Sequence, residues 1–202
     1  PSALGILSID NVTTTLVSLS WPIPFGNISS YIIQVLGTPS KELTVYANSF
    51  HVDELTPGNY YAFVVFARAG NMNGTKTENY TFIYPSAIVS LIIDNVTTTS
   101  VSLSWPIPLG NISSYIIQVL GSSSMELIVN TKASLVDQLI PGNKYTFTVF
   151  ATVGNLNGTK IKNSTFTVPG NINIMKIDKL SNSSLYVSWQ LTEGNRTSYL
   201  VE

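Results

Sequence analysis

The stretch Asn11–Gly37 reads NVTTTLVSLSWPIPFGNISSYIIQVLG, and it returns almost unchanged at Asn95–Gly121 as NVTTTSVSLSWPIPLGNISSYIIQVLG. The two copies begin 84 positions apart, and the same spacing separates Trp21, Trp105 and Trp189. A fixed period of this kind is the sequence sign of a tandem array. A period of 84 residues is long for a solenoid repeat but lies within the size of an independent domain.

The period divides the 202 residues into two complete repeats and the start of another. We expect one domain over residues 1–85, a second over residues 86–169, and the N-terminal part of a third, incomplete domain over residues 170–202. Tyr31, Tyr115 and Tyr199 mark the same position in the three repeats.

The composition excludes several classes of function. The net charge is −1 and only 10% of residues are charged, against about 25% in typical domains, so we expect no nucleic-acid partner. The mean hydropathy is high at +0.25, but no apolar run approaches the roughly 18 residues of a membrane span. We therefore expect no membrane contact within this segment. The chain has no cysteine, which excludes disulfides and thiolate metal sites.

Apolar and polar residues alternate along each repeat, which is typical of half-buried strands. Seven short strands separated by turn signals predict an all-β fold, a seven-stranded immunoglobulin-like β-sandwich. The predicted inward rows of the first repeat are Leu7 and Ile9; Val17, Leu19 and Trp21; Tyr31, Ile33 and Val35; Leu43 and Val45; Phe50 and Val52; Tyr61, Phe63, Val65 and Ala67; and Tyr80, Phe82 and Tyr84.

A longer motif carries a family resemblance. Leu55–Ala67 follows the pattern L-x-P-G-x-x-Y-x-F-x-V-x-A, and Leu139–Ala151 follows it again. With a Trp on the second strand and a Tyr opening the third, each repeat resembles a fibronectin type III domain. The resemblance implies that Tyr61 and Tyr145 form the tyrosine corner, in which a hydroxyl binds nearby backbone. The segments VTTTSVSLSW and GNISSYIIQVLG are also similar to the repeated ectodomains of receptor-type tyrosine phosphatases of the eta and beta kind.

Asn-x-Ser/Thr is the one enriched chemical motif, and it is the acceptor motif for N-linked glycans on secretory-pathway proteins. Glycans would supply the hydration that the low charge does not. The alternative is that Asn, Ser and Thr are simply common in β-turns. Counted from Phe82, Asn79 is expected on the outward side of its strand. The ten sequons begin at Asn11, Asn27, Asn73, Asn79, Asn95, Asn111, Asn157, Asn163, Asn182 and Asn195.

No other motif predicts a catalytic, cofactor or metal site. His51 and Asp53 share one strand face, but the second repeat has Leu135 in place of His51. Gly70–Gly74 lacks the lysine and the following helix of a phosphate loop. The Arg-Gly-Asp tripeptide is absent. We expect no enzyme activity and no cofactor other than N-linked glycans.

These observations predict an extracellular, N-glycosylated spacer or adhesion stalk, part of a larger cell-surface receptor ectodomain. The alternative is the repeating subunit of an extracellular structural filament, since near-identical domains of low charge favour lateral contacts. The expected partners are proteins, including further copies of the chain. In the third repeat, the apolar row Met175, Ile177, Leu185, Val187 and Trp189 would be open to water unless further strands or a neighbouring chain cover it.

Overall fold

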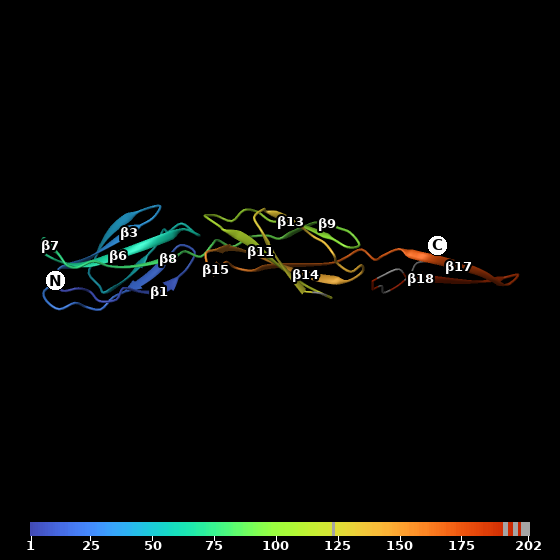
Figure 1. The fold of residues 1–202 in the computed structure, drawn as a ribbon, viewed down its shortest axis with the longest axis horizontal. Helices are drawn as coiled ribbons and strands as arrows, with labels where there is room; N and C mark the ends of the chain where they lie inside the picture. Colours follow the sequence, from blue (N-terminus) through green and yellow to red (C-terminus); the bar gives the residue numbers. More distant parts are fainter. Residues whose placement is uncertain (123, 192–193, 196–197, 199–202) are drawn as a thin grey trace. The chain divides into compact units, whose positions relative to one another are not determined.

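The computed structural model describes the chain except residues 123, 192–193, 196–197 and 199–202. Tyr199 therefore lies outside the described residues. The described part is all strand and turn, as expected from the alternating pattern (Figure 1). It contains no helix that could span a membrane.

The first domain contains eight strands, which form two sheets. One sheet has the order β1-β2-β5; in the other, β4, β3 and β6 are neighbours, and β7 and β8 both pair with β6. The strands are β1 (Ser8–Val12), β2 (Val17–Ser20), β3 (Ser30–Leu36), β4 (Lys41–Val45), β5 (Ser49–Val52), β6 (Tyr60–Ala69), β7 (Met72–Asn73) and β8 (Thr77–Phe82).

The second domain repeats this topology with sheets β9-β10-β13 and β12-β11-β14, and β15 and β16 pair with β14. All described strand pairs are antiparallel. The strands are β9 (Ile92–Val96), β10 (Val101–Ser104), β11 (Ser114–Leu120), β12 (Ser124–Val129), β13 (Ala133–Val136), β14 (Lys144–Val153), β15 (Leu156–Asn157) and β16 (Ile161–Phe166).

Seven strands of each domain match the expected ones, and the eighth lies in the predicted glycine-rich loop. In the first domain this is β7, a two-residue strand that folds back on the end of β6. Gly70 has a φ of 55° at the turn between them. Glycine adopts this left-handed conformation without the steric cost of a Cβ atom, so the loop closes as a tight hairpin.

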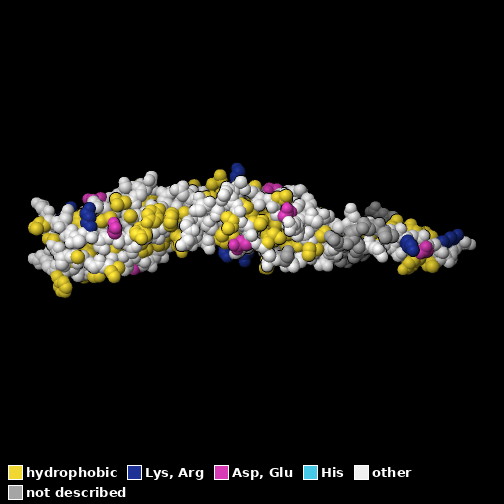
Figure 2. Space-filling view, in the orientation of Figure 1, with side chains coloured by type: hydrophobic (Ala, Val, Ile, Leu, Met, Phe, Trp, Pro, Cys, Tyr) yellow, Lys and Arg dark blue, Asp and Glu magenta, His cyan; other side chains and the backbone are white. Residues whose placement is uncertain are grey.

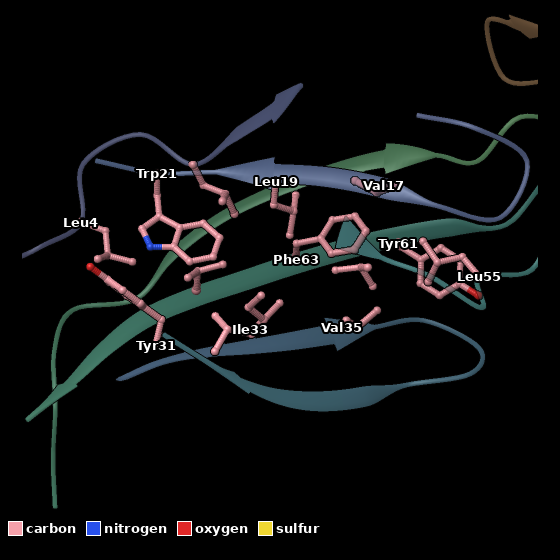
Figure 3. Packing of buried hydrophobic residues seen from close by; sticks show 14 of the residues in the cluster. Leu4, Val17, Leu19, Trp21, Tyr31, Ile33, Val35, Leu55, Tyr61 and Phe63 are labelled. Atoms are coloured by element: carbon pink, nitrogen blue, oxygen red, sulfur yellow. The ribbon is translucent and has the colours of Figure 1, made fainter. Parts of the chain in front are cut away.

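The core of each domain lies between its two sheets. Figure 3 shows Leu19 from β2, Ile33 from β3 and Phe63 from β6 pointing into this space, and each is almost completely buried. The rings of Trp21 and Tyr31 meet edge to face with centroids 5.4 Å apart. Full burial of one such apolar side chain stabilises a fold by about 1.5–3 kcal/mol. The predicted inward rows on β2, β3 and β6 are therefore confirmed.

The second domain repeats the aromatic pair of the first. Trp105 and Tyr115 are buried, with ring centroids 5.3 Å apart. Burial raises the pKa of the Tyr115 hydroxyl, because the charged form loses its hydration. Tyr115 is therefore neutral at physiological pH and serves as a packing residue.

The predicted inward row on β8 is wrong. Tyr80 is 63% exposed, whereas Ile83, just beyond the strand, is completely buried. The aromatic rings lie on the outer face, where Tyr60 of β6 packs against both Tyr80 and Phe82, with centroids 5.8 and 5.0 Å apart. Cross-strand aromatic pairing stabilises these rings without core burial. The inward side of β8 carries Asn79, so its expected outward orientation is also wrong.

The tyrosine corner is present in both domains. The Tyr61 hydroxyl accepts a hydrogen bond from the Thr56 amide at 3.1 Å and donates one to the Thr38 carbonyl at 2.6 Å. A Cβ atom on Gly37 would clash with the Tyr61 ring, which explains the glycine there. In the second domain, the Tyr145 hydroxyl accepts from the Ile140 amide at 3.0 Å.

The chain enters and leaves the first domain at opposite ends of β2. Near the entry, the Ser2 hydroxyl accepts a hydrogen bond from the Phe25 amide, which follows β2, at 3.0 Å. Near the exit, the Tyr84 amide donates to the carbonyl of Thr13, which precedes β2, at 3.2 Å. This geometry suits a domain that is threaded in a series.

The third segment forms a hairpin of β17 (Ile172–Ser181) and β18 (Ser184–Leu191). Its apolar side chains are open to water, as the sequence predicts for strands without covering partners. Met175 is 64% exposed, Ile177 55% and Leu185 63%, while Val187 and Trp189 are half-buried.

Candidate functional site at the asparagine sequons

Eight of the ten sequon asparagines are exposed, and the other two are half-buried. Asn27 lies in the loop before β3, as expected, whereas Asn73 lies on the short strand β7 rather than in a loop. The described part of the chain thus presents most acceptor side chains to solvent. The exposed set is Asn11, Asn27, Asn73, Asn95, Asn111, Asn157, Asn182 and Asn195.

The two half-buried asparagines, Asn79 and Asn163, have the same structural role. The Asn79 side-chain amide donates a hydrogen bond to the Leu7 carbonyl at 2.8 Å, and its oxygen accepts one from the Tyr80 amide at 2.8 Å. Asn163 donates to the Leu91 carbonyl at 2.8 Å. In each domain this amide joins the final strand to the segment just before the first strand, where the edges of the two sheets meet.

The hydroxyls of the Asn11 and Asn95 sequons close turns of the backbone. The Thr13 hydroxyl, which completes the Asn11 sequon, accepts hydrogen bonds from the Thr15 and Leu16 amides at 3.2 and 3.0 Å. This closes the turn between β1 and β2, and Thr97 repeats the arrangement. Turn formation is thus one local reason for Asn-x-Thr at this position.

Ser29, in the Asn27 sequon, links two loops at one end of the first domain. Its hydroxyl donates to the Arg68 carbonyl at 2.8 Å and accepts from the Gly70 amide at 3.1 Å. Asn73 lies on β7, which follows the turn at Gly70, and its side-chain oxygen accepts a hydrogen bond from the Arg68 guanidinium at 3.1 Å. Hydrogen bonds therefore hold the Asn27 and Asn73 sequons at the same end of the domain.

The sequons are distributed unevenly around each domain. They lie on the edge strands β1 and β8, or β9 and β16, in the loop before β3 or β11, and on the short strand β7 or β15. None occurs between Ser30 and Gly70 or between Ser114 and Gly154, which includes the opposite edge strands β4 and β12. Each domain therefore has one side with acceptor asparagines and one side without them.

The structure brings His51 to Ser18 rather than to an acid. The Ser18 hydroxyl and His51 Nδ1 are 2.9 Å apart, as expected for directly opposed residues of β2 and β5. Asp53 instead receives the Lys41 ammonium, which lies 3.5 Å from its carboxylate oxygen. Among the described residues, no group of three or more His, Cys, Asp or Glu could hold a metal ion.

Sequence reasoning missed a polar chain across the outer face of the larger sheet. Gln34 donates to Glu42 at 2.9 Å and accepts from Lys76 at 3.1 Å, and the Lys76 ammonium lies 5.3 Å from the centre of the Phe66 ring. The second domain repeats the chain through Gln118, Glu126, Lys160 and Phe150. The 84-residue spacing of these polar residues was the signal that could have revealed it.

Comparison with known proteins agrees with this architecture. The family model "Fibronectin type III domain" matches residues 2–83 and 85–168. The chain is 30% identical over 213 residues to receptor-type tyrosine-protein phosphatase eta of Gallus gallus, covering 100% of the chain and 15% of that protein. It is 26% identical over 208 residues to tenascin-R of Homo sapiens, covering 96% of the chain and 15% of that protein.

A solved two-domain fibronectin type III segment from chicken tenascin matches with a TM-score of 0.66 and 20% identity. The match covers 80% of this chain and 97% of that segment, and it supports the fold. The chain spans about 15% of the length of these relatives, and its matches fall on β-sandwich modules rather than on a catalytic domain. The expectation that this segment is not an enzyme is thereby confirmed.

Proposed function

Because the chain belongs to the fibronectin type III family, we propose that it is an extracellular spacer or adhesion stalk within a larger cell-surface protein. The observation that supports this most is the match of the whole chain to repeats of a receptor phosphatase, together with matches to tenascins. Its partners are proteins. The domains occupy residues 1–85 and 86–169, and residues 170–202 begin a third domain of the same kind.

The stalk works by geometry. The chain enters the first domain at one end of β2 and leaves it at the other. A domain of this kind separates the segment that precedes it from the segment that follows it. The longest strands of the first and second domains, β6 and β14, have 10 residues each, and at about 3.3 Å per residue each spans about 33 Å.

N-linked glycans complete the proposed surface. Eight sequon asparagines are exposed, and only 10% of residues are charged, so glycans at most of the ten sites would hydrate an otherwise weakly polar surface. Glycosylation at Asn79 or Asn163 is chemically compatible with the fold. The glycan replaces one amide hydrogen and leaves the other to bind the carbonyl of Leu7 or Leu91.

Secretion of the chain from cultured animal cells tests this proposal. We expect an intact mass well above 21.9 kDa that falls toward this value after N-glycosidase treatment, with deamidation marking the occupied asparagines. A secreted protein whose mass equals that of the bare polypeptide would contradict the glycosylated surface. Retention of the chain inside the cell in a folded state would contradict the extracellular assignment.

A further inference from the structure

The edge strand β12 is a weakly protected edge of the larger sheet in the second domain. Within the described part of the chain, it pairs with β11 on one side and has no strand on the other. An open edge presents unpaired amides and carbonyls, which can bind another strand unless charged side chains or bulges prevent it. β12 carries one charged residue, Glu126, and its Ile128 side chain is 70% exposed.

The corresponding strand of the first domain is protected. β4 has Lys41 where β12 has Met125, and Thr44 where β12 has Ile128. The Lys41 ammonium donates to the Asp53 carbonyl at 2.6 Å, which holds a charge beside the strand. β4 thus has a charged and a polar side chain at the two positions where such groups would oppose association, and β12 has neither.

The open edge also lies on the side of the domain without sequons. In the second domain, Asn95 lies on β9 and Asn163 on β16, which are the edges opposite to β13 and β12. If these asparagines carry glycans, as the proposed function holds, the glycans leave β12 accessible. The glycans that would hydrate the rest of the domain therefore do not shield the apolar residues at this edge.

We propose that β12 is a homotypic contact site, where two copies of the chain pair their β12 strands antiparallel about a two-fold axis. Directly opposed residues in an antiparallel pair lie on the same face of the sheet. The two-fold axis, which is the centre of the pairing, therefore passes between the two copies of a single residue. A centre at Glu126 would oppose two carboxylates, which is unfavourable. A centre at Ile128 places Ile128 against its own copy, Leu127 against Val129, and Glu126 against Asn130. This register opposes apolar side chains to apolar side chains and Glu126 to the neutral Asn130, and it extends the larger sheet across two molecules.

Single-cysteine crosslinking tests the register, because the chain has no native cysteine. Under mild oxidation, we expect the full chain with Ile128→Cys to form a disulfide-linked dimer rapidly. Thr44→Cys, at the matching exposed position of β4, is the control and should remain largely monomeric. Equal crosslinking of the two variants would overturn the proposal. The absence of a dimer from Ile128→Cys would also overturn it, and this is the result expected if β12 binds a different protein.

Sedimentation equilibrium of the full chain tests the energetics. We expect a reversible monomer–dimer equilibrium, and Met125→Lys, which restores the residue of the first domain, should raise the dimer Kd by about tenfold or more. Leu135→His also restores a first-domain residue but lies on β13, so it should leave the Kd unchanged. A monomer at all concentrations, or an unchanged Kd in Met125→Lys, would refute the contact.

Both experiments are run on glycosylated and on bacterially produced protein. A bacterial protein that stays monomeric refutes the homotypic contact whether or not glycans exist, and glycan mapping decides the proposed surface separately. Dimerisation of the bacterial protein alone would show that glycans cover β12, which would also overturn the proposal.

Discussion

The side-chain amide of Asn79 donates a hydrogen bond to the main-chain carbonyl of Leu7 at 2.8 Å, and Asn163 repeats this bond to Leu91. Leu7 is 1% exposed. The bond therefore joins β8 to the start of the other sheet at a place where water has little access. A sequon asparagine thus has a structural role that is independent of any glycan.

Asn79→Ala should lower the free energy of unfolding of the first domain by about 1–3 kcal/mol, because a buried carbonyl loses its donor. Native-state hydrogen exchange of the β6 amides in bacterially produced protein measures the change. Asn73→Ala, at an exposed sequon, is the control and should cost less than about 0.5 kcal/mol. Equal losses in the two variants would show that the bond to Leu7 contributes nothing specific.

Tyr61→Phe should destabilise the first domain by a similar amount, about 1–3 kcal/mol, since it leaves the Thr56 amide without its acceptor and leaves the Thr38 carbonyl with the Asn59 side-chain amide as its remaining donor. The ring and its packing are kept, so the change isolates the hydroxyl. Exchange rates of the second domain serve as the internal reference and should not change. A stability equal to that of the parent chain would mean that water replaces the hydroxyl at both groups.

The sequence predicts most of this fold because the repeat length, the Trp–Tyr pair and the strand alternation depend on local pattern. Trp21, Tyr31 and Tyr61 are buried as expected. The sequence fails on β8, where the larger residues lie outside. Tyr80 and Phe82 pack against Tyr60 on the outer face, and this contact depends on which strand is the neighbour. Alternation alone shows which residues share a face of the strand, but it does not show which face points into the core.

The sequons show the same limit. Their motif is local, so all ten could be found from the sequence, and their exposure follows for turns such as that of Asn27. The bond of Asn79 to Leu7 spans 72 positions and could not be predicted from spacing. Sequons lie on the β8 side of the domain and not on the β4 side, and this difference can be recognised only when the strand order is known.

Trp105→Ala should lower the stability of the second domain by about 3–5 kcal/mol, because it removes a large buried side chain and leaves a cavity. Trp105 is 2% exposed and packs edge to face on Tyr115. Urea unfolding followed by exchange protection of β14 measures the loss, and β6 of the first domain provides the reference. A change below about 1 kcal/mol would contradict the burial of this indole.

Gln138→Gly should stabilise the second domain. Gln138 has a φ of 59°, and Glu54 has a φ of 54° at the matching position of the first domain. A left-handed conformation costs a residue with a Cβ atom about 1–2 kcal/mol, and glycine removes this cost. Glycine also has more conformational freedom in the unfolded chain, which lowers the stability of the fold by about 0.5–1 kcal/mol. The midpoints of these two ranges give an expected net gain of about 0.7 kcal/mol, measured as a higher urea midpoint with an unchanged slope. Gln138→Ala keeps the Cβ atom and should give no gain. Equal stability of the glycine and alanine variants would show that the left-handed backbone at this position carries no strain that glycine can relieve.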